Sequence, residues 1–178
     1  MSFVPVIVGS ETWTFDHLAP HSFPYEIESG GQVVTLVIDV SYSCHCFSRD
    51  PSIDEVLPAE LLYEHGRDRR ILDAVRYEFS KRLPGLIGDI EQRRILFAGP
   101  ENFLTLEATS SEGVPGYYQV FFVLYRKVGA KQRLELRVQS AYWVSHLHRR
   151  ARPTTLRKVR FKLIATAAYE GRRLHAAR

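Results

Sequence analysis

Alternating apolar and polar residues run through much of this chain, and they predict β-structure in two hairpins. The first hairpin comprises residues 25–29 and 32–46, on either side of Gly30-Gly31. The second comprises residues 117–127 and 132–143, joined by the sequence Val-Gly-Ala-Lys. A short turn containing glycine between two alternating runs is typical of antiparallel strands. We expect three apolar residues of the last run to share one face, namely Leu134, Leu136 and Val138.

Shorter stretches repeat the pattern of a strand. Valines alternate over residues 4–8, and alternation returns at residues 95–97 and 103–107. The polar segment 48–60 contains two prolines, and we expect it to be a loop. The sequence therefore predicts several further short strands separated by irregular connections.

Residues 68–83 have the period of a helix and predict the principal helix of the fold. Its apolar stripe would comprise Ile71, Leu72, Val75, Phe79 and Leu83. Pro84-Gly85 is expected to end or kink this helix. Residues 156–174 first alternate and then lose the alternation before Gly171, which predicts a strand followed by a short helix.

These elements predict an α+β fold: a mainly antiparallel sheet, one principal helix at about 68–83 and a carboxy-terminal strand and helix. The length of 178 residues fits a single domain. Apolar residues form 45% and charged residues 25% of the chain, as in soluble globular proteins. Neither a spanning segment nor a signal peptide is recognisable, so we expect a cytoplasmic protein without a membrane partner.

Two cysteines lie in the second predicted strand, with one residue between them. On a strand, Cys44 and Cys46 would share one face about 7 Å apart, which does not suit a disulfide. His45 would point the other way, so a catalytic Cys–His pair is not expected. A zinc site of both cysteines with His146 and His148 would have four ligands, but the spacing is atypical. We interpret the cysteines as buried core residues and expect no metal and no cofactor.

Charge is distributed unevenly along the chain. Residues 126–178 contain 15 of the 24 Lys and Arg but only two acids, Glu135 and Glu170. Residues 1–125 contain nine bases and 18 acids, so the net charge of +4 conceals an acidic amino-terminal part and a basic carboxy-terminal part. A strongly basic segment usually has an anionic partner, and RNA or DNA is the commonest one.

The basic residues cluster after two aromatic residues, Tyr142 and Trp143. Cations bind phosphates, and an aromatic ring can stack on a base. The sequence predicts nucleic-acid contacts by Trp143 and by Arg149, Arg150, Arg152, Arg157, Lys158, Arg160 and Lys162. Three alternatives remain open: the cations balance the acidic part of the same fold, they bind an acidic protein, or they attract a second copy of the chain.

A narrower hypothesis is RNA cleavage without a metal. Such a ribonuclease needs a base, an acid and cations that stabilise the phosphorane. His146 or His148 would act as acid and base, Arg149 would hold phosphate, and Tyr142 would stack or orient the substrate. The alternative is that both histidines are surface residues. The chain has no P-loop, GxGxxG, HExxH or GxSxG motif, which disfavours nucleotide-driven and common hydrolase functions.

Several short sequences resemble a family of small, uncharacterised bacterial proteins. They are His45-Cys46-Phe47; Arg76-Tyr77, Ser80 and Leu83-Pro84; Val120-Phe121-Phe122; Val138, Ser140-Ala141-Tyr142; and Lys158-Val159-Arg160-Phe161. Members of this family are common on mobile elements, and some are labelled stationary-phase growth adaptation protein. The resemblance implies a mobile-element protein and names no catalytic residues.

The order of a helix, antiparallel strands and a basic end also resembles ribonuclease toxins of the RelE and barnase type. Those toxins are usually shorter, and the amino-terminal hairpin is an addition to their pattern. The resulting expectation is a protein that contacts nucleic acid, in its narrower form a toxin-type ribonuclease. The alternative is a non-enzymatic mobile-element protein that binds host or phage proteins as an inhibitor or assembly component.

Overall fold

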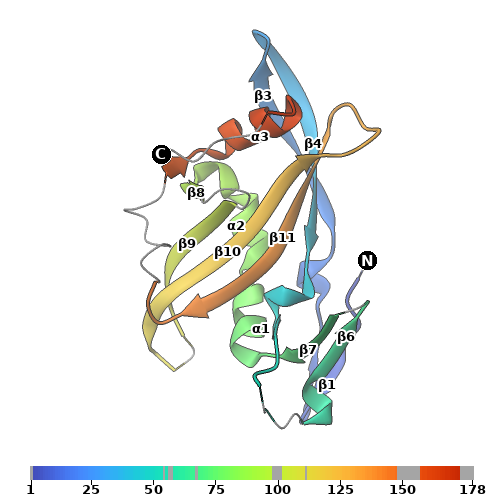
Figure 1. Ribbon diagram of the computed structural model, residues 1–178, viewed down its shortest axis with the longest axis vertical. Helices are drawn as coiled ribbons and strands as arrows, with labels where there is room; N and C mark the ends of the chain where they lie inside the picture. The colour runs from blue at the N-terminus through green and yellow to red at the C-terminus, as the bar shows by residue number, and fades with distance from the viewer. Residues whose placement is uncertain are drawn as a thin grey trace.

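A seven-stranded sheet forms the centre of the computed structural model, which describes residues 2–53, 55, 58–66, 68–97, 102–110, 112–147 and 157–172 (Figure 1). The strand order is β12-β8-β9-β10-β11-β4-β3, and every neighbouring pair is antiparallel except β11 and β4. In chain order these strands are β3 (His21–Ser29), β4 (Gln32–Tyr42), β8 (Ile95–Phe97), β9 (Asn102–Thr109), β10 (Pro115–Arg126), β11 (Arg133–Val144) and β12 (Arg157–Val159).

Two smaller sheets lie at the lower end of the molecule in Figure 1. One pairs β1 (Val6–Val8) with β2 (Glu11–Trp13). The other has the order β5-β7-β6, with β5 (Ser48–Arg49), β6 (Leu62–His65) and β7 (Asp68–Leu72). Single 3-10 turns connect the elements: η1 (Asp16–Leu18), η2 (Cys44–Cys46), η3 (Ala59–Leu61) and η4 (Ile90–Gln92).

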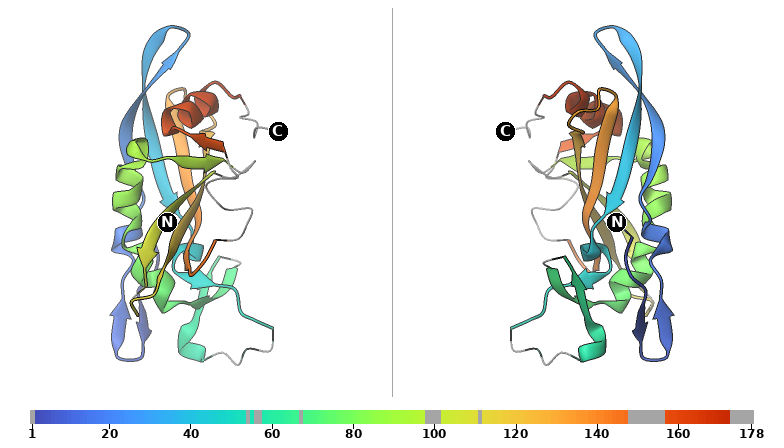
Figure 2. Two further views of the ribbon diagram at one scale, coloured as in Figure 1. Left: turned by 90° about the vertical axis from the view of Figure 1, so that its left-hand side faces the viewer. Right: turned by 90° about the vertical axis from the view of Figure 1, so that its right-hand side faces the viewer.

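The helices pack on one face of the central sheet, here called the inner face (Figure 2). They are α1 (Ala74–Ser80), α2 (Leu83–Gly88) and α3 (Phe161–Tyr169). The ring of Phe79 in α1 lies 5.0 Å from that of Tyr118, and Phe161 in α3 lies 5.1 Å from Tyr25. The core fills the space between these helices and the inner face, where alternate residues of β4, β10 and β11 are fully buried. The opposite face is called the outer face.

The α+β class and both predicted hairpins are confirmed. The strands that flank Gly30-Gly31 are β3 and β4, and the second hairpin consists of β10 and β11. Leu134, Leu136 and Val138 are buried on the inner face, as their alternation predicted. The carboxy-terminal strand and helix are also present, and Gly171 follows α3 with a φ of 68° that suits glycine.

The predicted helix over residues 68–83 was wrong in its first third. Residues 68–72 form β7, which pairs with both β5 and β6. The helix begins only after Asp73, whose side chain accepts a hydrogen bond from the backbone N–H of Arg76 at 2.9 Å and caps it. Pro84 does not end the helical region but lies in the first turn of α2, where its missing N–H is not needed.

Residues 44–46 differ from the predicted strand as well. β4 ends at Tyr42, and the Cys-His-Cys sequence forms η2, which lies against β11. In the described part of the chain, no helix is long and apolar enough to cross a bilayer.

Candidate functional site

The outer face of the central sheet presents aromatic and polar side chains. On β10 the residues that alternate with the buried core positions are Tyr117, Gln119, Phe121, Val123 and Tyr125. Their partners on β11 include Tyr142, Ser140 and Arg137. Tyr125 is 42% exposed, and Arg137 is also exposed. The strand alternation has therefore placed a row of rings, the cation Arg137 and the carboxylate Glu135 on the face opposite the buried core positions.

Tyr142 belongs to a stack of three planar groups. Its ring lies 5.5 Å from that of Phe121 at an interplanar angle of 22°, and the guanidinium of Arg76 lies 5.0 Å from its centroid. Arg76 comes from α1 and also donates from Nη1 to the carbonyls of His45 (3.1 Å) and Ser48 (2.8 Å). One arginine thus connects the first helix, η2 and the aromatic residues of the sheet.

The cross-strand register places Lys158, a residue predicted to bind nucleic acid, in the same row as Phe121. Phe121 pairs with Phe103, Phe103 with Leu96, and Leu96 with Lys158. Lys158 is exposed and therefore projects a charge on the outer face, about 14 Å from Phe121 across three strand spacings. Gln119 on β10 and Leu96 on β8 lie on the same face and are buried, so this face is accessible only in part.

Tyr142 and Trp143, which the sequence joined in one interaction surface, point to opposite faces of β11. The indole N–H of Trp143 donates to the carbonyl of Ala108 at 3.1 Å. A Cβ added to Gly116 would lie 2.5 Å from the Trp143 ring, so that ring packs directly on the glycine. Trp143 therefore cannot share a platform with Tyr142, because successive side chains on a strand alternate.

Of the four predicted catalytic residues, the structure describes Tyr142 and His146. His146 lies just beyond the end of β11, is exposed, and its Nδ1 is 2.8 Å from Oγ of Ser145. A fully extended chain would separate Tyr142 from His146 by about 13 Å. His148 and Arg149 lie outside the described residues, as do Arg150 and Arg152. Only the backbone of Arg157 is described.

Some of the carboxy-terminal cations are paired with acids from the amino-terminal part. Lys162 contacts Glu28 at 2.8 Å, and Lys127 contacts Asp39 at 3.1 Å. Arg133 also binds Asp39, and the bonds from Arg133, with help from Ser22 and Lys127, hold the pKa of that carboxyl well below its usual range. Arg160 is exposed and, among the described residues, forms no ion pair. Part of the charge asymmetry is therefore neutralised within the fold.

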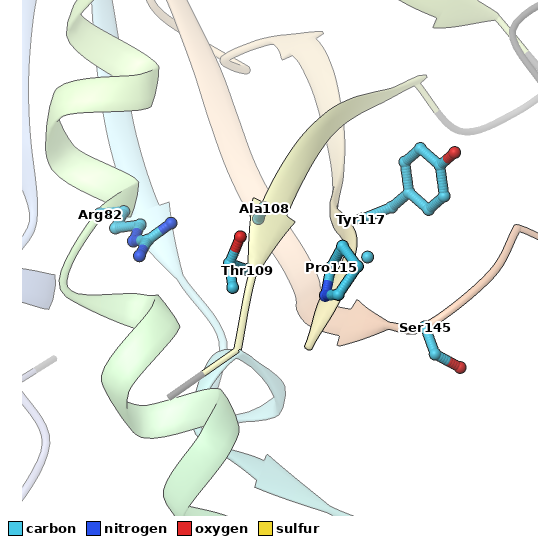
Figure 3. A pocket seen from close by; sticks show the side chains of 7 residues that line it. Arg82, Ala108, Thr109, Pro115, Tyr117 and Ser145 are labelled. Carbon is cyan, nitrogen blue, oxygen red and sulfur yellow. The ribbon is translucent and has the colours of Figure 1, made fainter. Parts of the chain in front are cut away.

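A hollow of about 690 Å³ lies where β9, β10 and β11 end near the helices. Figure 3 shows Arg82 reaching toward β9 from one side, with Tyr117 and Ser145 on the other side of the hairpin. The guanidinium of Arg82 lies 4.6 Å from the Phe79 ring, and among the described residues it forms no ion pair. His146 follows Ser145 directly, so this hollow adjoins the predicted catalytic segment.

A second polar hollow, of about 410 Å³, lies between β11 and the start of β7. It is lined by Ser43, His45, Asp68, Arg137, Gln139 and Ser140. The strand register skips Gln139, since Phe121 pairs with Ser140 and Phe122 with Val138. Such a bulge redirects a side chain and is frequent beside functional sites.

Cys44, His45 and Asp68 converge at the wall of this second hollow. The Cys44 thiol lies 3.8 Å and the His45 Nε2 3.6 Å from the same oxygen, Oδ2 of Asp68. This corrects the expectation that the histidine points away from its cysteine neighbour, because that expectation assumed a strand. In the tighter 3-10 turn, Cys44 and His45 both reach the carboxylate of Asp68, which lies 24 and 23 residues further along the chain.

Burial determines the protonation of this cluster. Burial is the main cause that lowers the pKa of His45, and the positive charge of Arg70 lowers it further. Together these two effects outweigh Asp68, which raises the pKa. Burial also raises the pKa of the Cys44 thiol, and Asp68 adds to that shift. At neutral pH the cluster therefore contains a neutral imidazole and a protonated thiol, which is the wrong form for a nucleophile. Cys46 is fully buried as well, and burial raises its pKa to about 12.

Hydrogen bonds hold the turn that carries this cluster. The Ser48 hydroxyl donates to the Cys44 carbonyl at 2.6 Å and accepts from Arg70 Nε at 2.9 Å. The Ser43 hydroxyl accepts from the backbone N–H of His45. These residues could have been singled out only by knowing the turn, because Ser43, Ser48 and Arg70 have no recognisable sequence motif.

Comparison with known proteins identifies a family. No curated protein and no solved structure gives a significant match to the chain. The model of the YjaZ family matches residues 5–169, a range that includes every element from β1 to α3. The chain therefore belongs to the YjaZ family. This match confirms the prediction of a bacterial family that was based on the short sequence motifs.

Proposed function

We propose that this protein binds single-stranded nucleic acid along the outer face of its central sheet. The observation that carries the proposal is the coincidence on one face of the Arg76–Tyr142–Phe121 stack, the exposed ring of Tyr125 and the exposed cation Arg137. Single strands are bound by such combinations, because bases stack on aromatic rings while cations follow the phosphates.

The position of the rings favours stacking over readout of a duplex. A flat sheet face does not enter the major groove, whereas splayed bases can lie on it. Tyr125 is the most accessible ring of the row, and Val123 between it and Phe121 is half-buried. We expect one base to stack on Tyr125 and another to contact the edge of the Phe121–Tyr142 pair.

The cations that would follow the backbone come from two sides. Arg137 adjoins the aromatic row through its pairing with Val123 on β10, and Lys158 projects on the same face from β12. Arg149, Arg150 and Arg152 are predicted to bind nucleic acid as well, and they lie outside the described residues. Lys162 contributes less, because it already contacts Glu28.

The test is a fluorescence-anisotropy titration with labelled single-stranded RNA and DNA and with duplex DNA. Each phosphate contact to a single strand should give a slope of about −0.7 in log K against log salt. Arg137→Ala should reduce that slope by one contact. Lys81→Ala removes a similar exposed charge on the helical side and should leave binding unchanged. Equal losses for both variants, or no saturable binding at low salt, would refute the proposal.

A matched pair of variants at Tyr125 tests the contribution of base stacking. Tyr125→Ala should weaken binding roughly 5- to 150-fold, which corresponds to about 1–3 kcal/mol per stacked base. Tyr125→Phe keeps the ring and should bind like the wild type. A loss that is the same for both substitutions would mean that the hydroxyl, not the ring, makes the contact.

Cleavage is the narrower form of this proposal. Tyr142 lies on β11 and His146 follows two residues after its end, and His148 and Arg149 would complete the set. Wild-type protein incubated with RNA in EDTA should then produce fragments, and the His146→Ala/His148→Ala double variant should not. Intact RNA with wild-type protein would restrict the function to binding. Absence of any nucleic-acid binding would favour a protein partner for the basic surface instead.

A further inference from the structure

We propose that Cys44, His45 and Asp68 form a binding site for one zinc ion whose fourth position opens onto the 410 Å³ hollow beside β11. Arg137 lines this hollow as well as the proposed nucleic-acid face, but the inference of a metal site does not rest on nucleic-acid binding. One ligand atom from each residue lies within 4.8 Å of the other two. Sulfur, imidazole nitrogen and carboxylate oxygen together are the ligand types that zinc accepts.

The distances fit a tetrahedral ion. Zinc bonds of about 2.3 Å to sulfur, 2.05 Å to nitrogen and 2.1 Å to oxygen place adjacent tetrahedral ligands about 3.4–3.6 Å apart. The corresponding separations to Asp68 Oδ2 are 3.6 Å for His45 Nε2 and 3.8 Å for Cys44 Sγ. The ligand atoms of Cys44 and His45 lie within 4.8 Å of each other, so binding one ion would draw these two atoms together by about 1 Å at most. On binding, the thiol would lose its proton to solvent and bind as the thiolate.

A hydrogen-bond acceptor, Oε1 of Gln139, adjoins the hollow at the fourth coordination position of the proposed zinc ion. Oε1 of Gln139 is buried and, among the residues that the structure describes, accepts no hydrogen bond. Its residue is the bulged position of β11 and lines the same hollow as His45 and Asp68. A buried acceptor without a donor is uncommon in a folded protein. A water bound to the zinc would donate to this oxygen, and that arrangement would leave an open coordination position of the kind found in catalytic zinc sites.

The surroundings hold the three ligands in place before any ion binds. Arg76 donates to the backbone carbonyl of His45, and Ser48 donates to that of Cys44. Asp68 is fixed by the pairing of β7 with β6, in which it lies opposite His65. Such supporting contacts orient metal ligands and raise affinity.

Metal binding by the full-length chain without an affinity tag tests the proposal. After treatment with a chelator and desalting, titration with Zn²⁺ followed by calorimetry should show one site per chain. Replacement by Co²⁺ should give the thiolate-to-cobalt charge-transfer band and the intense visible absorption of a tetrahedral site. Neither readout requires nucleic acid, so failure here leaves the proposed function unaffected.

Matched variants assign the ligands. Asp68→Asn preserves the shape of the side chain and should weaken Zn²⁺ binding on the order of 10- to 100-fold or more. Asp50→Asn, which alters another exposed carboxylate nearby, should bind like the wild type. Cys44→Ala should abolish the charge-transfer band, whereas Cys46→Ala should retain it.

Two results would overturn the site. One is the absence of a stoichiometric Zn²⁺ site in the wild-type protein. The other is equal affinity of the wild type and Asp68→Asn, which would mean adventitious binding elsewhere. If Cys44→Ala does not fold, the comparison of Asp68→Asn with Asp50→Asn still decides the question, because both substitutions are isosteric and lie at the surface.

Discussion

Arg76 should contribute more to stability than its place on a short helix suggests. Arg76→Met keeps the length of the side chain but removes its donors and its charge. The His45 carbonyl would lose its bond from Nη1, whereas the Ser48 carbonyl would still accept from Arg70 Nη2 at 3.3 Å. A hydrogen bond to a charged group contributes about 1.5–3 kcal/mol. The contact with the Tyr142 ring adds about 0.5–1 kcal/mol.

Part of this loss of stability is offset, because the variant no longer has to bury the Arg76 charge. Burial lowers the pKa of Arg76, so the native fold already spends free energy on keeping the guanidinium away from water. We therefore expect a net destabilisation of about 2–3 kcal/mol. In a chain of this length that difference lowers Tm by about 4–12 °C. Urea unfolding followed by tryptophan fluorescence measures the free energy directly.

Two comparisons separate the contributions of Arg76. Arg82→Met removes a guanidinium that also lies over a ring but, within the described part of the chain, makes no backbone hydrogen bond, so this variant should lose less than about 1 kcal/mol of stability. A double-mutant cycle of Arg76→Met with Tyr142→Leu should give a coupling of about 0.5–1 kcal/mol. If Arg76→Met unfolds within about 0.5 kcal/mol of the wild type, the assigned role of its hydrogen bonds is wrong.

Two further predictions concern packing and pH. Gly116→Ala should destabilise by about 1–3 kcal/mol or more, because its Cβ would lie 2.4 Å from the Val144 carbonyl oxygen, while Gly85→Ala, with open space around it, should be neutral or stabilising in urea unfolding. Because bonding to Arg133 lowers the pKa of Asp39 in the folded state, its stabilisation should be complete above the unfolded pKa of about 3.9 and decline as pH falls below it. The stability difference between wild type and Asp39→Asn should therefore shrink on acidification, and a constant difference would contradict the assignment.

Local pattern was sufficient for the two hairpins and the side of each strand that faces the core. Alternation along β10 and β11 is a property of neighbouring residues, and it assigned Leu134, Leu136 and Val138 to the same face correctly. The same period of two puts Tyr142 and Trp143 on opposite faces, and the prediction of one interaction surface for both residues was wrong because it overlooked this consequence. The cluster of basic residues was visible in the sequence, whereas its pairing with Glu28 and Asp39 was not.

Residues 68–72 show where a local pattern is ambiguous. Ile71 and Leu72 fit a helical stripe with Phe79, and they fit a short buried strand equally well. Residues 68–72 form a strand because pairing with β5 and β6 provides hydrogen-bond partners for their backbone groups. The helix α1 can then begin after its capping residue, Asp73. The pairing of β7 with β5 joins residues up to 24 positions apart, Ser48 and Leu72, which no local window contains.

The sequence by itself determined the strands of the central sheet, the inward faces of its two hairpins, the carboxy-terminal helix and the uneven charge, because each depends on residues close together in the chain. Tertiary structure alone decided the parallel pairing of β11 with β4, the alignment of Lys158 with Phe121 across the sheet and the meeting of Cys44 and His45 with Asp68. These contacts join distant segments, and the packing of helices and sheets in three dimensions selects among the many pairings that the local patterns allow.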